Sequence, residues 1–371
     1  MIRLALRNLF QNKIRLTILV GGVALALLLI LSLDAIFTGV EGQVTAYINN
    51  SGADIFVSQE DVRNLHMASS ALPAGDANRV KAVRGVEQVT PIHYVTNMIV
   101  IGEERNLAYI IGLPSQAVMG GPWKIAAGKS LPKRGEAVID RGVADKSGVS
   151  IGDEVEILGE KLKLVGLSEG TTSLVNSVAF ISMEDFVALR GGADTVSYLL
   201  VKVKPGETLE DVVVLIQARL RDKATIQTRH DFAEQERLVV KDMSTDVITI
   251  MNLIGFLIGL AVMALTVYTT TLARRNEYGV LKAIGAHNSQ LYGTVLAQAL
   301  LSVILGLGVG LAFTLLMSAI IPRLGLNLIL EVSPMSLLKV SAFSLVIAGF
   351  AAILPIRQIA GLDPAMVFRG K

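Results

Sequence analysis

The sequence predicts a membrane protein with four transmembrane α-helices plus an N-terminal amphipathic helix, and with an α+β extracytoplasmic domain between transmembrane helices 1 and 2. Composition is the first reason. The chain of 371 residues is 52% hydrophobic and only 18% charged, and its mean hydropathy of +0.56 exceeds that of soluble globular proteins. The second reason is a set of apolar runs of bilayer-spanning length. The third is the alternating, turn-rich pattern of residues 41–246, which is typical of a domain folded in water.

The distribution of charge predicts the topology. The ten basic residues that flank the apolar runs are Arg3, Arg7, Lys13, Arg15, Arg274, Arg275, Lys282, Arg357, Arg369 and Lys371. Only Glu277 and Asp363 are acidic in these segments, so the remainder of a chain whose net charge is +2 carries −6. Because basic flanks stay inside, both termini and residues 274–290 are expected in the cytoplasm, and the protein in the cell membrane. Basic residues that flank spans do not form a nucleic-acid patch.

Residues 1–15 are expected to form the amphipathic helix. Ile2 and Leu6 fall on one side of a helical wheel, and Arg3 and Arg7 fall on the other. The simpler alternative is a basic flank of the first span. The following apolar run is long and is not ended by a clear cleavage site, so a removable signal peptide is not expected.

The first span is predicted over residues 16–40, and it contains a single acid, Asp34. A carboxylate at membrane depth is costly, which makes Asp34 a candidate substrate contact. The alternative is that Asp34, which is close to the end of the span, faces the outer lipid headgroups.

Residues 41–246 are predicted to form an α+β domain outside the cytoplasm, because one span precedes it and the next one follows it. The predicted strands are 53–58, 95–101, 108–111, 137–140, 154–157, 161–165, 178–181 and 198–203, and the predicted helices are 76–84, 183–189 and 209–221. The stretch 231–246 is expected to be a charged helical stalk, with Leu238, Val239 and Met243 on one side, that leads directly into the second span.

Motifs for chemistry are weak in this domain. The chain has no cysteine, and its four histidines lack the spacing of a metal site, so no metal is expected. The sequence Gly128-Lys129-Ser130 ends like a phosphate-binding loop, but the leading glycine and the preceding strand are missing, so we interpret it as a surface turn. His66 and Met67 could together ligate haem iron. The alternative is an exposed loop pair.

The last third of the chain contains three more predicted spans. They cover residues 247–273, 291–321 and 335–356, with an outer loop at 322–334 and a cytoplasmic tail at 357–371. Two small-xxx-small pairs, Gly255 with Gly259 and Gly306 with Gly310, are expected to allow close helix contact. Tyr268, near the inner end of the second span, is a further candidate substrate contact, although a role in helix packing is the simpler interpretation.

Residues 274–290, RRNEYGVLKAIGAHNSQ, form a polar turn between two apolar runs. Leu281 and Ile284 alternate with polar positions in a way that suits a short helix on the membrane surface or in the groove of a partner. The sequence therefore predicts a docking element at the cytoplasmic face.

Three segments resemble one family. Residues 274–286 are similar to the R-R-x-E-I-G-x-L-R-A-I/L-G-A block of ATP-binding-cassette (ABC) permeases of the FtsX-like superfamily, which are type VII exporters. Residues 131–140, 151–155 and 164–167 are similar to the extracytoplasmic domain of the MacB-like permeases within it. Residues 355–369 are similar to the P-x-x-x-x-A-x-x-x-P-x-x-A-L-R tail of the same superfamily, with Val-Phe-Arg in place of Ala-Leu-Arg.

The resemblance covers nearly the whole chain and implies a role for the 274–286 block as a coupling helix that sits in a cleft of an ATPase subunit. The residues that this role would use are Arg274, Arg275, Glu277, Gly279, Leu281, Lys282, Ile284 and Gly285. The chain itself would be no enzyme and would bind no cofactor, since ATP and Mg would be used by the partner ATPase.

The resemblance also implies a homodimer with two ATPase subunits, set among membrane lipids, and it allows a periplasmic adaptor protein. Such permeases export amphipathic or hydrophobic substrates, namely lipids, lipopeptides, drugs or haem. The alternative is a mechanotransmitting signalling complex that regulates a wall hydrolase or a sensor kinase without transport.

Overall fold

The computed structural model describes residues 13–66, 69–102, 104–172, 177–221, 223–321 and 328–361. The chain divides into two compact units. The helical unit is built from Met1–Gly39, Ser244–Arg323 and Ile329–Lys371, and the sheet unit from Val40–Met243 and Leu324–Leu328. The predicted amphipathic helix falls almost wholly on residues outside the described ones, as do Met67 and most of the tail.

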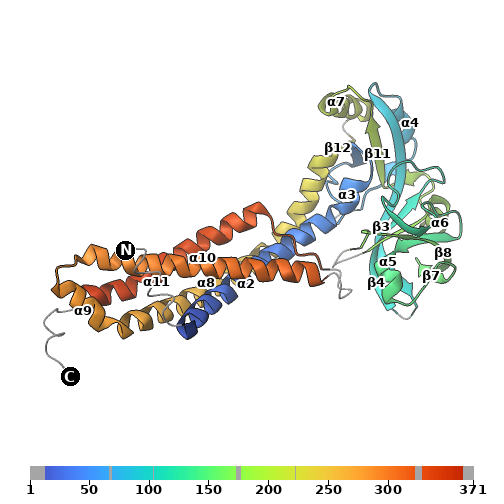
Figure 1. The fold of residues 1–371 in the computed structure, drawn as a ribbon. Helices are drawn as coiled ribbons and strands as arrows, with labels where there is room; N and C mark the ends of the chain where they lie inside the picture. Colours follow the sequence, from blue (N-terminus) through green and yellow to red (C-terminus); the bar gives the residue numbers. More distant parts are fainter. Residues whose placement is uncertain are drawn as a thin grey trace. The chain divides into compact units, whose positions relative to one another are not determined.

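Within the described residues, five helices contribute to the helical unit, and Figure 1 labels them. They are α2 (Lys13–Val44), α8 (Arg229–Ala273), α9 (Arg275–Ala283), α10 (Asn288–Ile320) and α11 (Pro334–Ala360). Among the described residues, α2, α8, α10 and α11 are the helices long and apolar enough to cross a bilayer. This confirms the prediction of one span before the sheet unit and three after it. The short helix α9 joins α8 to α10.

The four long helices share one apolar core. Its buried members include Leu27 and Leu31 on α2, Met263 on α8, Val295 on α10 and Ile347 on α11. Of the four, α8 has the smallest buried share in its most apolar stretch, 17%, against 28–39% in the others. Most of the apolar surface of α8 within the helical unit therefore faces away from this core.

Both glycine pairs pack against α2. A Cβ on Gly255 would lie 2.7 Å from Cγ1 of Ile30, and one on Gly306 would lie 2.7 Å from Cγ1 of Val23. Equivalent atoms on Gly259 and Gly310 would each lie 3.2 Å from an atom of α2. The glycines thus let α8 and α10 approach α2 within a single chain, so they provide no argument for contact between two copies.

The sheet unit contains one large mixed sheet. Its strands are β1 (Ile55–Gln59), β3 (Val86–Ile101), β4 (Glu104–Leu113), β5 (Ile125–Gly128), β6 (Glu136–Asp140), β7 (Glu154–Ile157), β8 (Glu160–Ser168), β9 (Ser177–Ser182), β11 (Tyr198–Val203) and β12 (Ala224–Thr228). The order is β12-β1-β11-β3-β4-β9-β6-β8-β5, with β7 paired to β3 and β8. Pairing is antiparallel except for β4 with β9 and β6 with β8. A separate pair joins β2 (Leu72–Pro73) to β10 (Thr195–Val196).

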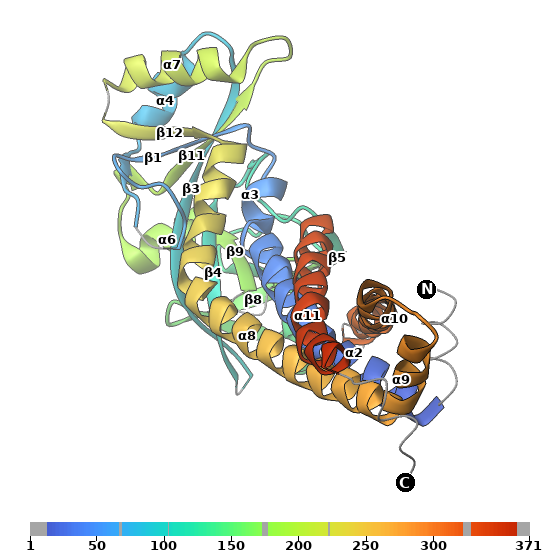
Figure 2. The ribbon, with the colours of Figure 1, turned by 90° about the vertical axis from the view of Figure 1, so that its left-hand side faces the viewer.

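The long strand β3 connects two halves of the sheet, because it pairs with β11 along its first part and with β4 along its second. In one half, α4 (Asp76–Lys81) and α7 (Leu209–Leu220) lie side by side over β1 and β11 (Figure 2). In the other half, α5 (Arg141–Lys146) and α6 (Met183–Arg190) accompany β6, β4 and β9. Each half has its own buried apolar cluster.

A third apolar cluster lies on the opposite face of the sheet and is covered by helix ends. Tyr47 and Ile48 of α3 (Ala46–Asn50) are buried there, together with Phe232 and Ala233 from the first turn of α8. Phe232 stacks on Phe56 with ring centroids 4.7 Å apart. The start of α8 is therefore part of the core of the sheet unit.

Candidate functional site

The segment between α8 and α10 forms a helix with a defined start and end. Arg274 leaves the helical conformation, with φ −106° and ψ 15°, so that α9 is separate from α8. At the other end, the amide of Ala286 donates to the carbonyl of Leu281 at 2.9 Å, and Gly285 has φ +99°. This positive φ favours glycine, which ends the helix and turns the chain toward α10. His287 and Gln290 then form a capping box at the start of α10.

One face of α9 packs against the apolar core of the helical unit. The ring of Tyr278 is only 2% exposed and belongs to the same cluster as the core residues of α10 and α11. Gly279 is buried beside it, and Leu281 packs against the cluster. Burial raises the pKa of the Tyr278 hydroxyl, which keeps the ring neutral. Lys282 also belongs to this face: its Nζ donates to the carbonyls of the last two residues of α11, at 3.2 and 3.1 Å.

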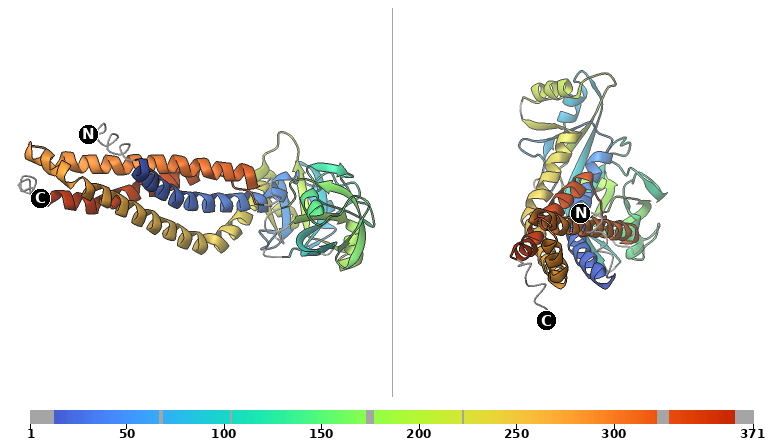
Figure 3. Two further views of the ribbon diagram at one scale, coloured as in Figure 1. Left: turned by 60° about the horizontal axis from the view of Figure 1, so that its bottom comes forward. Right: turned by 60° about the vertical axis from the view of Figure 1, so that its left-hand side comes forward.

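The other face of α9 is exposed. Val280 is 45% exposed, and Ile284, the C-cap residue that directly follows α9 and is counted here with its outward face, is 76% exposed, with Arg275 and Glu277 beside them. Arg274 is nearly buried, and its guanidinium lies 3.5 Å from the Glu277 carboxylate. Figure 3 shows this segment at the end of the helical bundle where α8 stops and α10 begins. The residues of the predicted coupling block are thus brought together, but Gly279, Leu281 and Lys282 point inward, and the outward apolar residues are Val280 and Ile284.

At the opposite end of the helical unit, Asp34 faces Lys339, a pairing that was not predicted from the sequence. Its Oδ1 lies 3.8 Å from the ammonium of Lys339 on α11, and its side chain is 15% exposed. The second oxygen, Oδ2, is buried with no hydrogen-bond partner among the described residues. The segment after Leu328 contacts this end of α2, since the amide of Glu331 donates to the carbonyl of Ala35 at 3.0 Å.

His66 lies in a buried polar chain inside the sheet unit. Its Nδ1 contacts a carboxylate oxygen of Glu236 on α8, and its Nε2 contacts the hydroxyl of Tyr109 on β4. Glu236 is fully buried, and its other oxygen accepts a hydrogen bond of 2.6 Å from the amide of Leu65. Burial lowers the pKa of the His66 imidazole, which suits a neutral ring that donates through Nδ1 and accepts through Nε2.

Both nitrogens of His66 are therefore occupied by contacts within the chain, an arrangement that does not favour haem ligation. Leu238 and Met243, which lie on the apolar side predicted for this stalk, are both exposed, and its buried residues include Phe232, Ala233 and Glu236. Buried positions were predicted from the pattern of apolar residues, and a glutamate does not contribute to that pattern. The burial of Glu236 was therefore not predicted.

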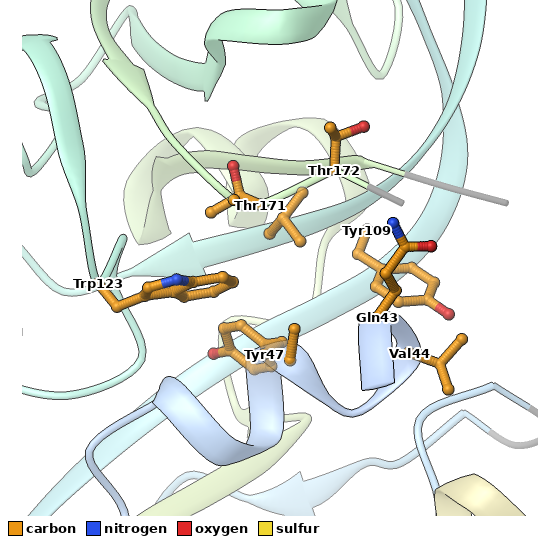
Figure 4. Close-up of a pocket in the computed structure, with 10 residues that line it drawn as sticks. Gln43, Val44, Tyr47, Tyr109, Trp123, Thr171 and Thr172 are labelled. Atoms are coloured by element: carbon orange, nitrogen blue, oxygen red, sulfur yellow. The ribbon is translucent and has the colours of Figure 1, made fainter. Parts of the chain in front are cut away.

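Two cavities in the sheet unit lie on either side of Trp123. The smaller, about 10 Å³, has room for one water and is lined by Gln43, Val44, Tyr47, Tyr109, Trp123, Thr171 and Thr172, among others (Figure 4). The larger, about 230 Å³, is lined mainly by backbone and small side chains near Ser51 and Gly120, with Trp123 and Leu131. Neither is lined by Asp34, His66 or Tyr268, and Tyr268 is 36% exposed on α8. Among the described residues, no group of three or more His, Asp or Glu could hold a metal ion.

Known proteins are similar to this chain along its whole length. A family model described as the MacB-like periplasmic core domain matches residues 16–219, and one described as the FtsX-like permease C-terminal domain matches residues 249–364. An uncharacterized ABC transporter permease of Mycobacterium tuberculosis is 22% identical over 99% of both chains. The macrolide export ATP-binding/permease protein MacB of Shewanella oneidensis is 22% identical over 98% of this chain and 59% of its own length.

Among solved structures, the periplasmic region of MacB from Actinobacillus actinomycetemcomitans matches with 14% identity and a TM-score of 0.40, over 51% of this chain and 94% of that one. The family models alone span more than half of the sequence, and only residues 220–248 lie between the two matches. The chain therefore belongs to the family of ABC transporter permeases that combine a MacB-like periplasmic core domain with an FtsX-like C-terminal region.

Proposed function

We propose that this chain is the membrane subunit of an ATP-driven exporter and that the exposed face of α9 binds the ATPase. The observation that carries the proposal is the division of α9 into two faces. Tyr278 and Leu281 seat the helix on the bundle, while Val280 and Ile284 remain exposed between charged neighbours. An apolar pair with a polar rim is typical of a helix that docks into a groove. Hydrolysis of ATP, with its Mg, would be carried out by the separate ATPase subunit.

The orientation follows from charge. Arg274, Arg275 and Lys282 lie at the α9 end of the helical unit against the single acid Glu277, so the positive-inside rule assigns that end to the cytoplasm. Both termini would then be cytoplasmic and the sheet unit extracytoplasmic, in a protein of the cell membrane. The absence of native cysteine allows a direct test: a cysteine at exposed Ser150 should react with an impermeant thiol reagent in intact cells, and one at exposed Ser289 should not. The reverse pattern would contradict the orientation.

The proposed assembly is a homodimer with two ATPase subunits. Support comes from the apolar surface that α8 leaves uncovered within the helical unit. The exposed apolar residues there include Val247, Ile250, Leu253, Ile254, Leu257, Ile258 and Leu265. Such a surface suits lipid or a second copy of the chain. A periplasmic adaptor would bind the sheet unit, which is the part of the chain outside the membrane in this orientation.

The proposed substrate is an amphipathic or hydrophobic molecule, a lipid, lipopeptide, drug or haem, moved out from the membrane or the periplasm. The relative from Shewanella oneidensis, named as a macrolide export protein, supports this class. Asp34 stays a candidate contact, although a ligand headgroup would have to compete with Lys339 for the carboxylate.

A mechanotransmitting signalling complex is the second candidate, and one observation favours it. Phe232 and Ala233 in the first turn of α8 are buried in the core of the sheet unit, and the same helix, 45 residues long in all, ends next to α9. A continuous helix of this kind can carry motion whether or not a substrate moves.

The two functions predict different stimulators of ATP hydrolysis. The chain should be reconstituted in proteoliposomes with the ABC ATPase that co-purifies with it, and ATP hydrolysis measured with added lipids, haem and amphiphilic drugs. An exporter should show at least a severalfold stimulation by one of these amphiphiles. A flat response to all of them, with stimulation by an extracytoplasmic protein instead, would contradict export and support signalling.

A further inference from the structure

Lys282 contacts the end of α11. This contact connects α9 to the long helices in addition to its covalent links to α8 and α10. The ammonium donates to the carbonyls of Ile359, at 3.2 Å, and Ala360, at 3.1 Å. These are the last two residues of α11. Carbonyls in the last turn of a helix have no following turn to donate to them, and they carry the negative end of the helix dipole. A lysine here both satisfies them and neutralises that charge.

The lysine lies between two apolar anchors that belong to one core. On α9, Tyr278 is buried in the cluster shared by the long helices, and on α11, Ile359 is fully buried in the same cluster. Leu281, next to Lys282 in the chain, packs against that cluster as well. Tyr278 anchors α9 in the core, and the two hydrogen bonds of Lys282 then fix the rotation of α9 about its own axis.

The helix that receives these bonds is itself tightly joined to α10. The backbones of α10 and α11 approach each other closely, and Ala299 on one helix and Ala348 and Ala352 on the other are buried in the shared core. The span of α8, by contrast, contributes only Met263 and Val267 to the fully buried members of that core. We therefore expect a displacement of α9 to be transmitted to α10 and α11 more directly than to α8.

We propose that Lys282 is a positioning residue that fastens α9 to α11, so that α9, α10 and α11 move as one body when ATP binds to the partner ATPase. This rests on the proposed function, because α9 is taken as the site of ATPase docking. The contribution is separable from docking, since Lys282 belongs to the inward face and Val280 and Ile284 form the outward one.

The first test follows the far end of α11. A single cysteine at exposed Met335, in the first turn of α11, carries an environment-sensitive dye in the permease–ATPase complex. The signal is compared without nucleotide and with ATP, Mg and vanadate. Lys282→Met keeps the aliphatic stem and removes the donor, whereas Lys282→Arg keeps a positive donor. We expect the ATP-dependent signal to fall at least fivefold in Lys282→Met and to keep more than half its size in Lys282→Arg, with ATPase binding unchanged in both.

A full-sized signal in Lys282→Met would overturn the proposal, as would the absence of any ATP-dependent signal in the wild-type complex. Failure of the wild-type chain to bind an ATPase would instead contradict the proposed function itself.

A second measurement leaves Lys282 in place. With cysteines at the neighbouring exposed positions Ala283 and Gly361, a short bifunctional thiol reagent should crosslink α9 to α11 with equal yield in the nucleotide-free and the vanadate-trapped complex. A yield that falls severalfold on trapping would show that the two helices separate during the cycle, and it would overturn the proposal.

Discussion

The two ends of the helical unit are both held together through α11, but by different chemistry. At one end Lys339 of α11 faces the carboxylate of Asp34 on α2, and the backbone amide of Glu331 donates to the carbonyl of Ala35 on the same helix. At the other end Lys282 of α9 caps uncharged carbonyls of α11. Beyond this cap, Val280 and Ile284 are exposed. The Asp34 end is closed by contacts within the chain, whereas the α9 end presents an apolar surface that suits a partner.

The largest effect on the stability of the fold should come from the face of α9 that packs against the core. Tyr278→Ala removes a 2% exposed ring from the shared core, which should lower the free energy of unfolding by about 3–5 kcal/mol. Val280→Ala, two residues away on the exposed face, should change it by less than about 1 kcal/mol. Thermal unfolding in detergent would measure both. Equal effects of the two substitutions would contradict the division of α9 into an inward and an outward face.

A smaller effect is expected at the Asp34 end. Lys339→Met leaves a mostly buried carboxylate without its cation and should cost about 1–3 kcal/mol, near the lower limit because Lys339 itself is 58% exposed. Combining it with Asp34→Asn removes the unpaired charge and should recover most of the loss. The same detergent unfolding assay compares the single and double variants. If the double variant is less stable than Lys339→Met alone, then Asp34 is stabilised by something other than Lys339.

Local patterns predicted the parts of the fold that local chemistry determines. The four spans follow from run length, because a bilayer requires about 20 consecutive apolar residues. Each of the eight predicted strands overlaps a strand of the structure, from β1 to β11. The first part of β3 was missed, since Pro91 breaks the alternation, although this residue still faces Leu199 of β11 in the ladder. The strand β12 was missed as well, because ATIQT is too short and polar to stand out.

Contacts between distant residues could not be predicted in this way. Glu236 meets His66 across 170 positions, and Asp34 meets Lys339 from another helix. Helical spacing alone places Tyr278 and Lys282 on one side of α9 and Val280 and Ile284 on the other, but which side faces the core depends on tertiary packing. The candidate coupling residues were therefore identified as a block, while their division into two roles required the structure.

The central claim is that the outward face of α9 binds an ABC ATPase, and affinity between the purified subunits tests it most directly. Ile284→Glu places a charge on that face without touching the core, and Val214→Glu makes the same change at an exposed position on α7 of the sheet unit. Measured in detergent by surface-immobilised permease and soluble ATPase, Ile284→Glu should weaken binding at least tenfold, and Val214→Glu should leave it unchanged. Wild-type affinity in Ile284→Glu, with an intact thermal unfolding transition, would contradict the account.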